Sequence, residues 1–137
     1  MFVIQRRRRG VAGESILIVD DNPVNLKLAR VVLAGAGFAV RTAVDAEDAL
    51  ALLGRVPPPQ LILMDLQMPG MDGLELTRLL KKDPDLAKTV IVALTAYAMK
   101  GDEGKALEAG CDGYISKPID TRTLGATIAQ YLERSGR

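Results

Sequence analysis

Carboxylates, a hydroxyl and a lysine follow the ends of short apolar runs in this sequence. Asp20 and Asp21 come after the run SILIV, and Asp65 comes after LILM. Thr95-Ala96 and Lys117-Pro118 follow two later runs. Carboxylate oxygens suit magnesium, for which manganese should substitute. An aspartate can also attack phosphorus, while a lysine ammonium and a threonine hydroxyl stabilise the transferred phosphoryl group.

The apolar runs alternate with segments of helical period, a pattern typical of repeated βα units around a parallel sheet. The expected strands are Ser15 to Val19, Phe38 to Thr42, Leu61 to Met64, Val90 to Leu94 and Gly113 to Ser116. Three of these runs are apolar without alternation, as expected for central strands that helices cover on both faces. The sequence therefore predicts an α/β fold with five parallel strands.

The segments between the runs carry helix signals. Asn22-Pro23 is typical of an N-cap with proline at the first helical position, and Asp72 with Glu75 resembles a capping box. The helical period is carried by Val24, Leu28, Val31 and Val32 in the first segment and by Leu124, Ile128 and Leu132 in the last. The fourth helix has thin apolar content and contains Gly101 and Gly104, so we expect a marginal helix whose first turn frays.

The polar residues should meet, because ligands of open α/β sheets bind outside the carboxyl ends of the strands. Taken singly, each has an ordinary structural interpretation as a cap, a turn, a β-branched strand residue or a loop residue. Taken together at one end of four strands, they favour one pocket, formed by Asp20, Asp21, Asp65, Thr95 and Lys117. Repulsion among the three carboxylates in that pocket would raise the pKa of at least one of them unless a cation is present.

Composition excludes several classes of function. The chain has no histidine and one cysteine, Cys111. This composition argues strongly against a zinc site and against Ser/His/Asp catalysis. No apolar run approaches the ~20 residues that span a bilayer, and no secretory signal is present, so we expect a cytoplasmic protein.

Charge is distributed unevenly. Arg6, Arg7, Arg8 and Arg9 precede every acidic residue, and without them 14 basic residues face 17 acidic ones, a balance of −3. Such an arginine run can bind nucleic acid or an anionic membrane surface. The interpretation we favour is a disordered basic leader over residues 1–13 and a single domain over 14–137, whose body does not bind nucleic acid.

Four motifs in this order and spacing resemble the receiver domains of two-component response regulators, the CheY-like superfamily. They are Asp20-Asp21, Asp65 with Met68-Pro69-Gly70, Thr95-Ala96 and Lys117-Pro118, within a match from about Glu14 to Arg134. The stretches TAYAMKGDE and GCDGYISKPI look most like DivK-type single-domain regulators and the receivers of some hybrid kinases. The resemblance implies a doubly wound, flavodoxin-like sheet of strand order 2-1-3-4-5.

The resemblance also implies the roles of the site residues. Asp65 would be the phosphoacceptor, and Asp21 and Asp65 would bind magnesium directly. Asp20 would hold the metal through water, and the backbone carbonyl of Gln67 would supply a further ligand.

Other positions would bind or sense the phosphoryl group. Lys117, Thr95 and Ala96 would contact it, and Tyr114 would swing inward as Thr95 moves. The residues that would set the loop geometry are Pro69, Gly70 and Pro118, with a cis Lys117-Pro118 bond. Gln67 and Tyr97 would influence how quickly water reaches the acyl phosphate.

The implied function is a switch rather than an enzyme that acts on a separate substrate. It would accept a phosphoryl group from a histidine kinase or phosphotransfer protein, assist its own phosphorylation and dephosphorylation, and change the face formed by the fourth helix, fifth strand and fifth helix. A downstream protein would read that face, since no output domain follows within the sequence. We expect a monomer or weak dimer.

Three alternatives compete with this interpretation. A receiver segment of a hybrid kinase would relay the phosphoryl group by the same chemistry. A phosphatase of the haloacid dehalogenase type also uses an aspartate nucleophile, but Gln67 stands where that family needs a second acid. A flavodoxin-like flavin binder would need a phosphate-binding loop after the first strand, where Asp20-Asp21 would repel phosphate.

Overall fold

A computed structural model describes residues 13–95 and 102–134, which alternate between strands and helices. The strands are β2 (Ser15–Val19), β3 (Ala39–Ala43), β4 (Leu61–Asp65), β5 (Val90–Thr95) and β6 (Gly113–Ser116). The helices are α1 (Pro23–Gly35), α2 (Ala46–Leu53), α3 (Gly73–Lys81), α4 (Asp102–Ala109) and α5 (Leu124–Arg134). The expected leader over 1–13 falls, except for Gly13, outside the described residues, as do Ala96 and Tyr97.

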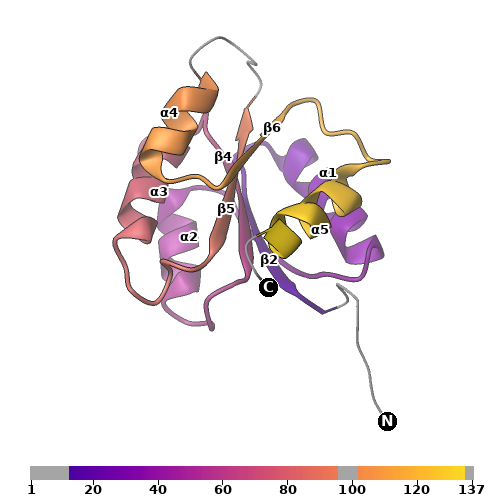
Figure 1. The fold of residues 1–137 in the computed structure, drawn as a ribbon, viewed down its shortest axis with the longest axis horizontal. Coiled ribbons are helices and arrows are strands. Elements are labelled where there is room, and N and C mark those ends of the chain that lie inside the picture. Colours follow the sequence, from indigo (N-terminus) through magenta and orange to yellow (C-terminus); the bar gives the residue numbers. More distant parts are fainter. Residues whose placement is uncertain (1–12, 96–101, 135–137) are drawn as a thin grey trace.

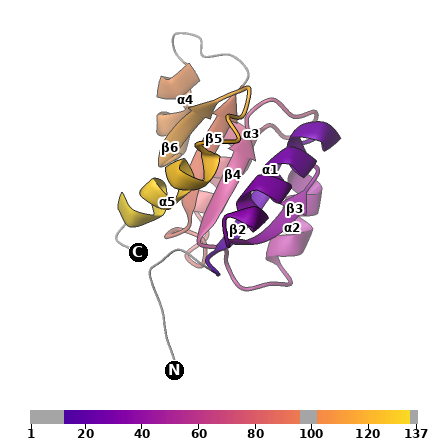
Figure 2. The same cartoon turned by 90° about the vertical axis from the view of Figure 1, so that its right-hand side faces the viewer.

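The five strands form one parallel sheet in the order β3-β2-β4-β5-β6, which confirms the predicted order 2-1-3-4-5 (Figures 1 and 2). Three strands differ from the prediction by one residue: β3 is shifted at both ends and runs from Ala39 to Ala43, β4 also includes Asp65, and β5 also includes Thr95. Hydrogen bonding continues through these two polar residues, so the ladder ends at the site residues themselves rather than before them.

Helices cover both faces of the sheet. Helices α1 and α5 lie on one face, and α2, α3 and α4 lie on the other (Figure 1). Strands β4 and β5 are buried along their whole length, which explains why their sequences are apolar without alternation. The sheet thus separates two apolar clusters, one in each layer.

The buried face of α1 differs from the predicted one. The large residues of the predicted stripe are exposed: Val24 by 73%, Leu28 by 38% and Val31 by 53%, while Val32 is partly buried. Ala29 and Leu33 are the fully buried residues of the helix. The predicted stripe is therefore displaced from the buried one, which includes the small Ala29 and the large Leu33. For α5 the predicted face, Leu124, Ile128 and Leu132, is buried as expected.

The predicted N-caps are present. The Asn22 side chain accepts hydrogen bonds from the backbone N–H groups of Val24 and Asn25, with Pro23 in the first helical turn. The Asp72 carboxylate accepts one from the Glu75 N–H at 2.9 Å. Both caps follow strands, so they fix where α1 and α3 begin relative to the carboxyl edge of the sheet. Within the described ranges, no helix is long and apolar enough to cross a membrane.

Candidate functional site

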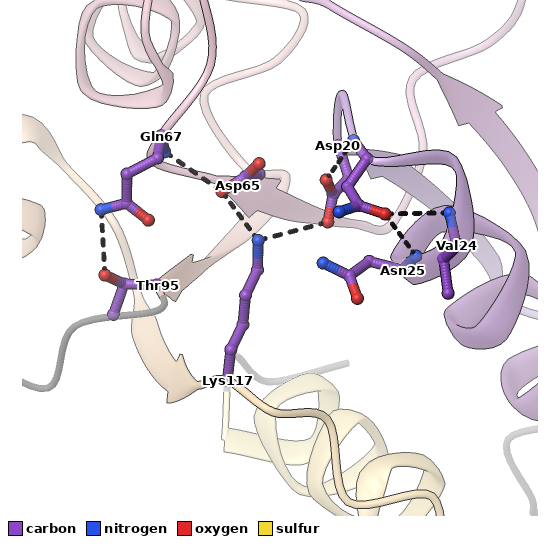
Figure 3. Close-up of polar contacts among 8 residues, drawn as sticks. Asp20, Val24, Asn25, Asp65, Gln67, Thr95 and Lys117 are labelled. Carbon is purple, nitrogen blue, oxygen red and sulfur yellow. Dashed lines mark hydrogen bonds and ion pairs between the residues drawn. The ribbon is translucent and has the colours of Figure 1, made fainter.

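The carboxyl ends of four strands bring the predicted polar residues together. Asp20 follows β2, Asp65 and Thr95 end β4 and β5, and Lys117 follows β6. Figure 3 shows the Lys117 ammonium pointing between the two aspartates, with Thr95 reached through Gln67. The convergence inferred from the strand ends therefore exists in the folded chain.

Three carboxylates form a compact cluster. One oxygen each of Asp20, Asp21 and Asp65 lies within 4.8 Å of the others. Asp20 and Asp65 are 1% exposed, whereas Asp21 faces solvent. Asp20 Oδ1 accepts a hydrogen bond from the Asn22 N–H at 2.9 Å, while its buried Oδ2 has no hydrogen-bond partner among the described residues. A buried oxygen without a hydrogen bond, beside two further carboxylates, fits a hard divalent cation such as Mg²⁺.

Lys117 supplies the positive charge. Its Nζ lies 3.2 Å from Asp65 Oδ1 and 3.6 Å from Asp20 Oδ2, and the side chain is 14% exposed. The shorter contact is a hydrogen bond, and the longer one is an ion pair without a hydrogen bond. The Lys117–Pro118 peptide bond is cis, as the family resemblance implied. One ammonium thus faces two buried carboxylates, which leaves negative charge in excess.

Burial and charge together shift the pKa of Asp65 upward. Burial, and secondarily the neighbouring Asp20 carboxylate, raise the pKa of Asp65 to about 7, against the opposing effects of the Gln67 N–H and Lys117. Near neutral pH the Asp65 carboxyl can therefore either hold a proton or, once deprotonated, bind a cation. The direction agrees with the expectation of a raised carboxylate pKa in this pocket, although burial contributes more than repulsion by the neighbouring carboxylate.

Gln67 joins the two sides of the site, a link that sequence reasoning missed. Its backbone N–H donates to Asp65 Oδ1 at 3.1 Å, and its side-chain Nε2 donates to Thr95 Oγ1 at 3.1 Å. Thr95 is fully buried. The signal in the sequence is the position of Gln67, two residues after Asp65, from which we expected a carbonyl ligand and an influence on water access, but no contact with Thr95.

Comparisons with known proteins agree on one family. The response regulator receiver domain model matches residues 16–129. The chain belongs to the response regulator receiver family. The polar-differentiation response regulator DivK of Brucella ovis is 43% identical over 122 residues, covering 87% of this chain and 96% of that protein.

Solved structures show the same fold. The chemotaxis response regulator CheY4 of Vibrio cholerae superposes with a TM-score of 0.82 at 27% identity, covering 88% of this receiver and 99% of that chain. The receiver domain of a histidine kinase from Syntrophus aciditrophicus gives 0.81 at 31% identity, covering 91% and 94%. This receiver thus resembles both stand-alone regulators and kinase-borne ones.

The loop after Asp65 has a tight geometry in this receiver. Gly70 adopts a positive φ of 73°, a conformation that favours glycine, directly after Pro69. Gly73, at the start of α3, was not singled out from the sequence, yet a Cβ there would overlap the Asp65 carbonyl oxygen and lie 2.9 Å from Leu66 Cα. The absent side chain at position 73 therefore lets α3 begin against the backbone of Asp65 and Leu66.

The expected switch aromatic lies on the edge strand. Tyr114, in β6, is partly buried and packs against the apolar cluster on the α2, α3 and α4 side of the sheet. Ala96, expected to bind the phosphoryl group through its backbone, lies outside the described residues. The roles of these two residues remain predictions.

Proposed function

We propose that this receiver is a response regulator that accepts a phosphoryl group on Asp65 from a phosphohistidine donor in the cytoplasm, with magnesium. A single observation carries the proposal: a buried aspartate with a pKa near 7 lies 3.2 Å from a lysine and within 4.8 Å of two further carboxylates. An Asp65 oxygen would form the new O–P bond as the donor N–P bond breaks, and the histidine nitrogen would leave with the electron pair.

The surrounding residues have distinct parts in this proposal. Asp20, Asp21 and Asp65 would hold the Mg²⁺, together with the Gln67 carbonyl, and Mn²⁺ should substitute. Bound Mg²⁺ supplies charge neutralisation for the phosphoryl oxygens. Lys117 would exchange its hydrogen bond with Asp65 for one to the phosphoryl group, and the Thr95 hydroxyl and Ala96 N–H would contact the other oxygens.

The donor is expected to be a protein, either a histidine kinase or a histidine phosphotransfer protein. The exposed apolar residues of α1, Val24, Leu28 and Val31, support this expectation, because they lie on the helix that begins directly after Asp20 and Asp21. An apolar surface beside the acceptor offers a partner protein area to bury. Phosphorylation would then alter the face formed by α4, β6 and α5, which a downstream protein reads.

In this proposal the protein assists its own phosphorylation and dephosphorylation but turns over no separate substrate. A receiver acting as a relay within a hybrid kinase is the second candidate, favoured by the likeness to the receiver of the Syntrophus kinase. Both candidates require the same chemistry at Asp65.

The test is intact-protein mass spectrometry after incubation with acetyl phosphate, with and without Mg²⁺. We expect one phosphoryl adduct on the wild-type chain in the presence of Mg²⁺, and none without the metal. Asp65→Asn should stay folded and carry no adduct. An equal adduct on Asp65→Asn would show that the acceptor is misassigned, whereas no adduct on the folded wild type would argue against acceptance from small donors.

A further inference from the structure

Helix α5 is tied to the edge strand β6 through one hydroxyl group. The Tyr131 hydroxyl donates to the Tyr114 carbonyl oxygen at 3.2 Å and accepts from the Tyr114 N–H at 3.3 Å. Because β6 lies at the edge of the sheet, no further strand among residues 13–95 and 102–134 satisfies these outward backbone groups. A side chain of α5 therefore takes the place of a neighbouring strand at this one residue.

The sequence is adapted to this contact. A Cβ at Gly113 would overlap the Tyr131 ring, so glycine at that position lets the ring lie against the strand. The Arg134 guanidinium lies 5.0 Å from the ring centroid, on a residue one turn later in α5. The ring is thus positioned by a strand residue and a helix residue together.

The contact joins the two layers of the protein. Tyr131 packs with the apolar cluster on the α1 and α5 face, whereas the side chain of Tyr114 packs with the cluster on the α2, α3 and α4 face. The hydroxyl therefore holds the backbone of a residue whose side chain belongs to the opposite layer. A shift of the Tyr114 side chain that moves its backbone must pull on Tyr131 or break both hydrogen bonds.

We propose that Tyr131 is a positioning residue that couples the backbone of Tyr114 to helix α5, so that phosphorylation of Asp65 changes α5 through this hydroxyl. The inference rests on the proposed function, in which Tyr114 responds to the state of Asp65. The strand register supports a path from Asp65 to Tyr114. In the β5–β6 pair, Tyr114 lies opposite Ala93 and Ser116 lies opposite Thr95. The Thr95 hydroxyl in turn accepts a hydrogen bond from the Gln67 side chain in the loop after Asp65.

The test compares the backbone amide NMR shifts of the full chain before and after addition of Mg²⁺ and beryllofluoride, which mimics a phosphoryl group. The variants are wild type, Tyr131→Phe, which removes only the hydroxyl, and Gly113→Ala, which displaces the ring. In wild type we expect shifts in the acceptor loop around Asp65 and in α5. In both variants the loop shifts should persist, and the α5 shifts should fall by at least half.

Amide exchange gives a second readout. In Tyr131→Phe, without beryllofluoride, the Tyr114 N–H should exchange about 2- to 10-fold faster, the range expected for loss of one neutral hydrogen bond. If Tyr131→Phe lowers Tm but keeps the wild-type α5 shifts, the hydroxyl is merely structural and the coupling is refuted. The same conclusion follows if only Gly113→Ala loses the α5 shifts. No shifts anywhere in wild type would refute the proposed function, and the coupling with it.

Discussion

The side-chain amide of Gln67 donates a hydrogen bond to Thr95 Oγ1 at 3.1 Å, and its backbone N–H donates to Asp65. One residue thus binds both the proposed acceptor and the hydroxyl that would have to approach the phosphoryl group. For Thr95 to move, the contact with the Gln67 amide must be released. If Asp65 is phosphorylated as proposed, Gln67 would favour the unphosphorylated arrangement of the site.

Removing the Gln67 amide should ease activation. A neutral hydrogen bond contributes about 0.5–1.5 kcal/mol, so Gln67→Ala should bind beryllofluoride in the presence of Mg²⁺ about 2- to 10-fold more tightly. The binding isotherm can be followed by NMR or calorimetry. Gln67→Met keeps the length of the side chain and should behave like Gln67→Ala. If Gln67→Met instead matched wild type, the side-chain amide would not restrain Thr95.

Without metal, stability should fall as pH rises. The pKa of Asp65 is raised to about 7 in the folded protein, and its ordinary value is 3.8, so between these values the folded state holds more protons than the unfolded state. The free energy of unfolding therefore decreases from about pH 4 to 7 and levels off above that range. Urea denaturation in EDTA at a series of pH values measures this slope.

Asp65→Asn is the control for the slope. It removes the titrating group, so it should be more stable than wild type at pH 8 in EDTA and show a flatter pH profile. Burial and Glu133 also raise the pKa of Glu14, and the slope that remains in Asp65→Asn reports that group. Mg²⁺ should stabilise wild type more at pH 8 than at pH 5.5, because it competes with the proton at Asp65. Equal stabilisation at both pH values would contradict the assignment.

Lys117 should matter more for the conformational change after phosphorylation than for the acceptance of the phosphoryl group. Removing Lys117 leaves Asp20 and Asp65 without a cationic partner. Lys117→Ala should therefore lose about 1–3 kcal/mol of stability at pH 8 in EDTA, and the loss should be smaller at pH 5.5. This loss of stability should be smaller than for a fully buried ion pair, because Asp65 can take up a proton once Lys117 is removed. The phosphoryl adduct should still form, with reduced α5 shifts. Exposed Lys82→Ala is the matched control and should change neither property.

The sequence predicted most of the site because one topological rule places it. Parallel strands end at the same edge, so Asp20, Asp65 and Lys117 had to converge once the strands were recognised. Contacts between side chains of distant segments could not be predicted in this way. The Gln67–Thr95 bond joins residues 28 apart, and the Tyr131 hydroxyl meets a backbone 17 residues away.

The face of α1 shows a different limit of sequence reasoning. Hydrophobic periodicity selected Val24, Leu28, Val31 and Val32, of which the first three are exposed and only Val32 packs against the core. The helix instead buries Ala29 and Leu33, with Leu26 and Val32 partly buried against the same cluster. A large apolar residue on a surface near a site can thus mark a partner-binding face rather than the core.

Gly73 should tolerate no side chain. In Gly73→Ala the new Cβ would overlap the Asp65 carbonyl oxygen and crowd Leu66, so either α3 or the acceptor loop must shift. We expect a loss of about 1–3 kcal/mol of stability and at least a 10-fold slower formation of the adduct with acetyl phosphate. Chemical denaturation and time-resolved mass spectrometry measure the two effects. A wild-type rate of adduct formation would show that the close approach at position 73 is not needed for the chemistry.

Gly104→Ala is the contrasting substitution and tests the marginal helix α4. A Cβ at Gly104 has no atom within 4 Å, so alanine fits without strain and should stabilise α4 by up to about 1 kcal/mol. If the first turn of α4 frays in the unphosphorylated state, amides near position 104 should exchange several-fold more slowly in Gly104→Ala than in wild type. Wild-type exchange already as slow as that of β4 would contradict fraying. Ordering the first turn of α4 would then cost less free energy in Gly104→Ala. A partner protein that binds the α4 face should therefore bind the unphosphorylated variant more tightly than unphosphorylated wild type.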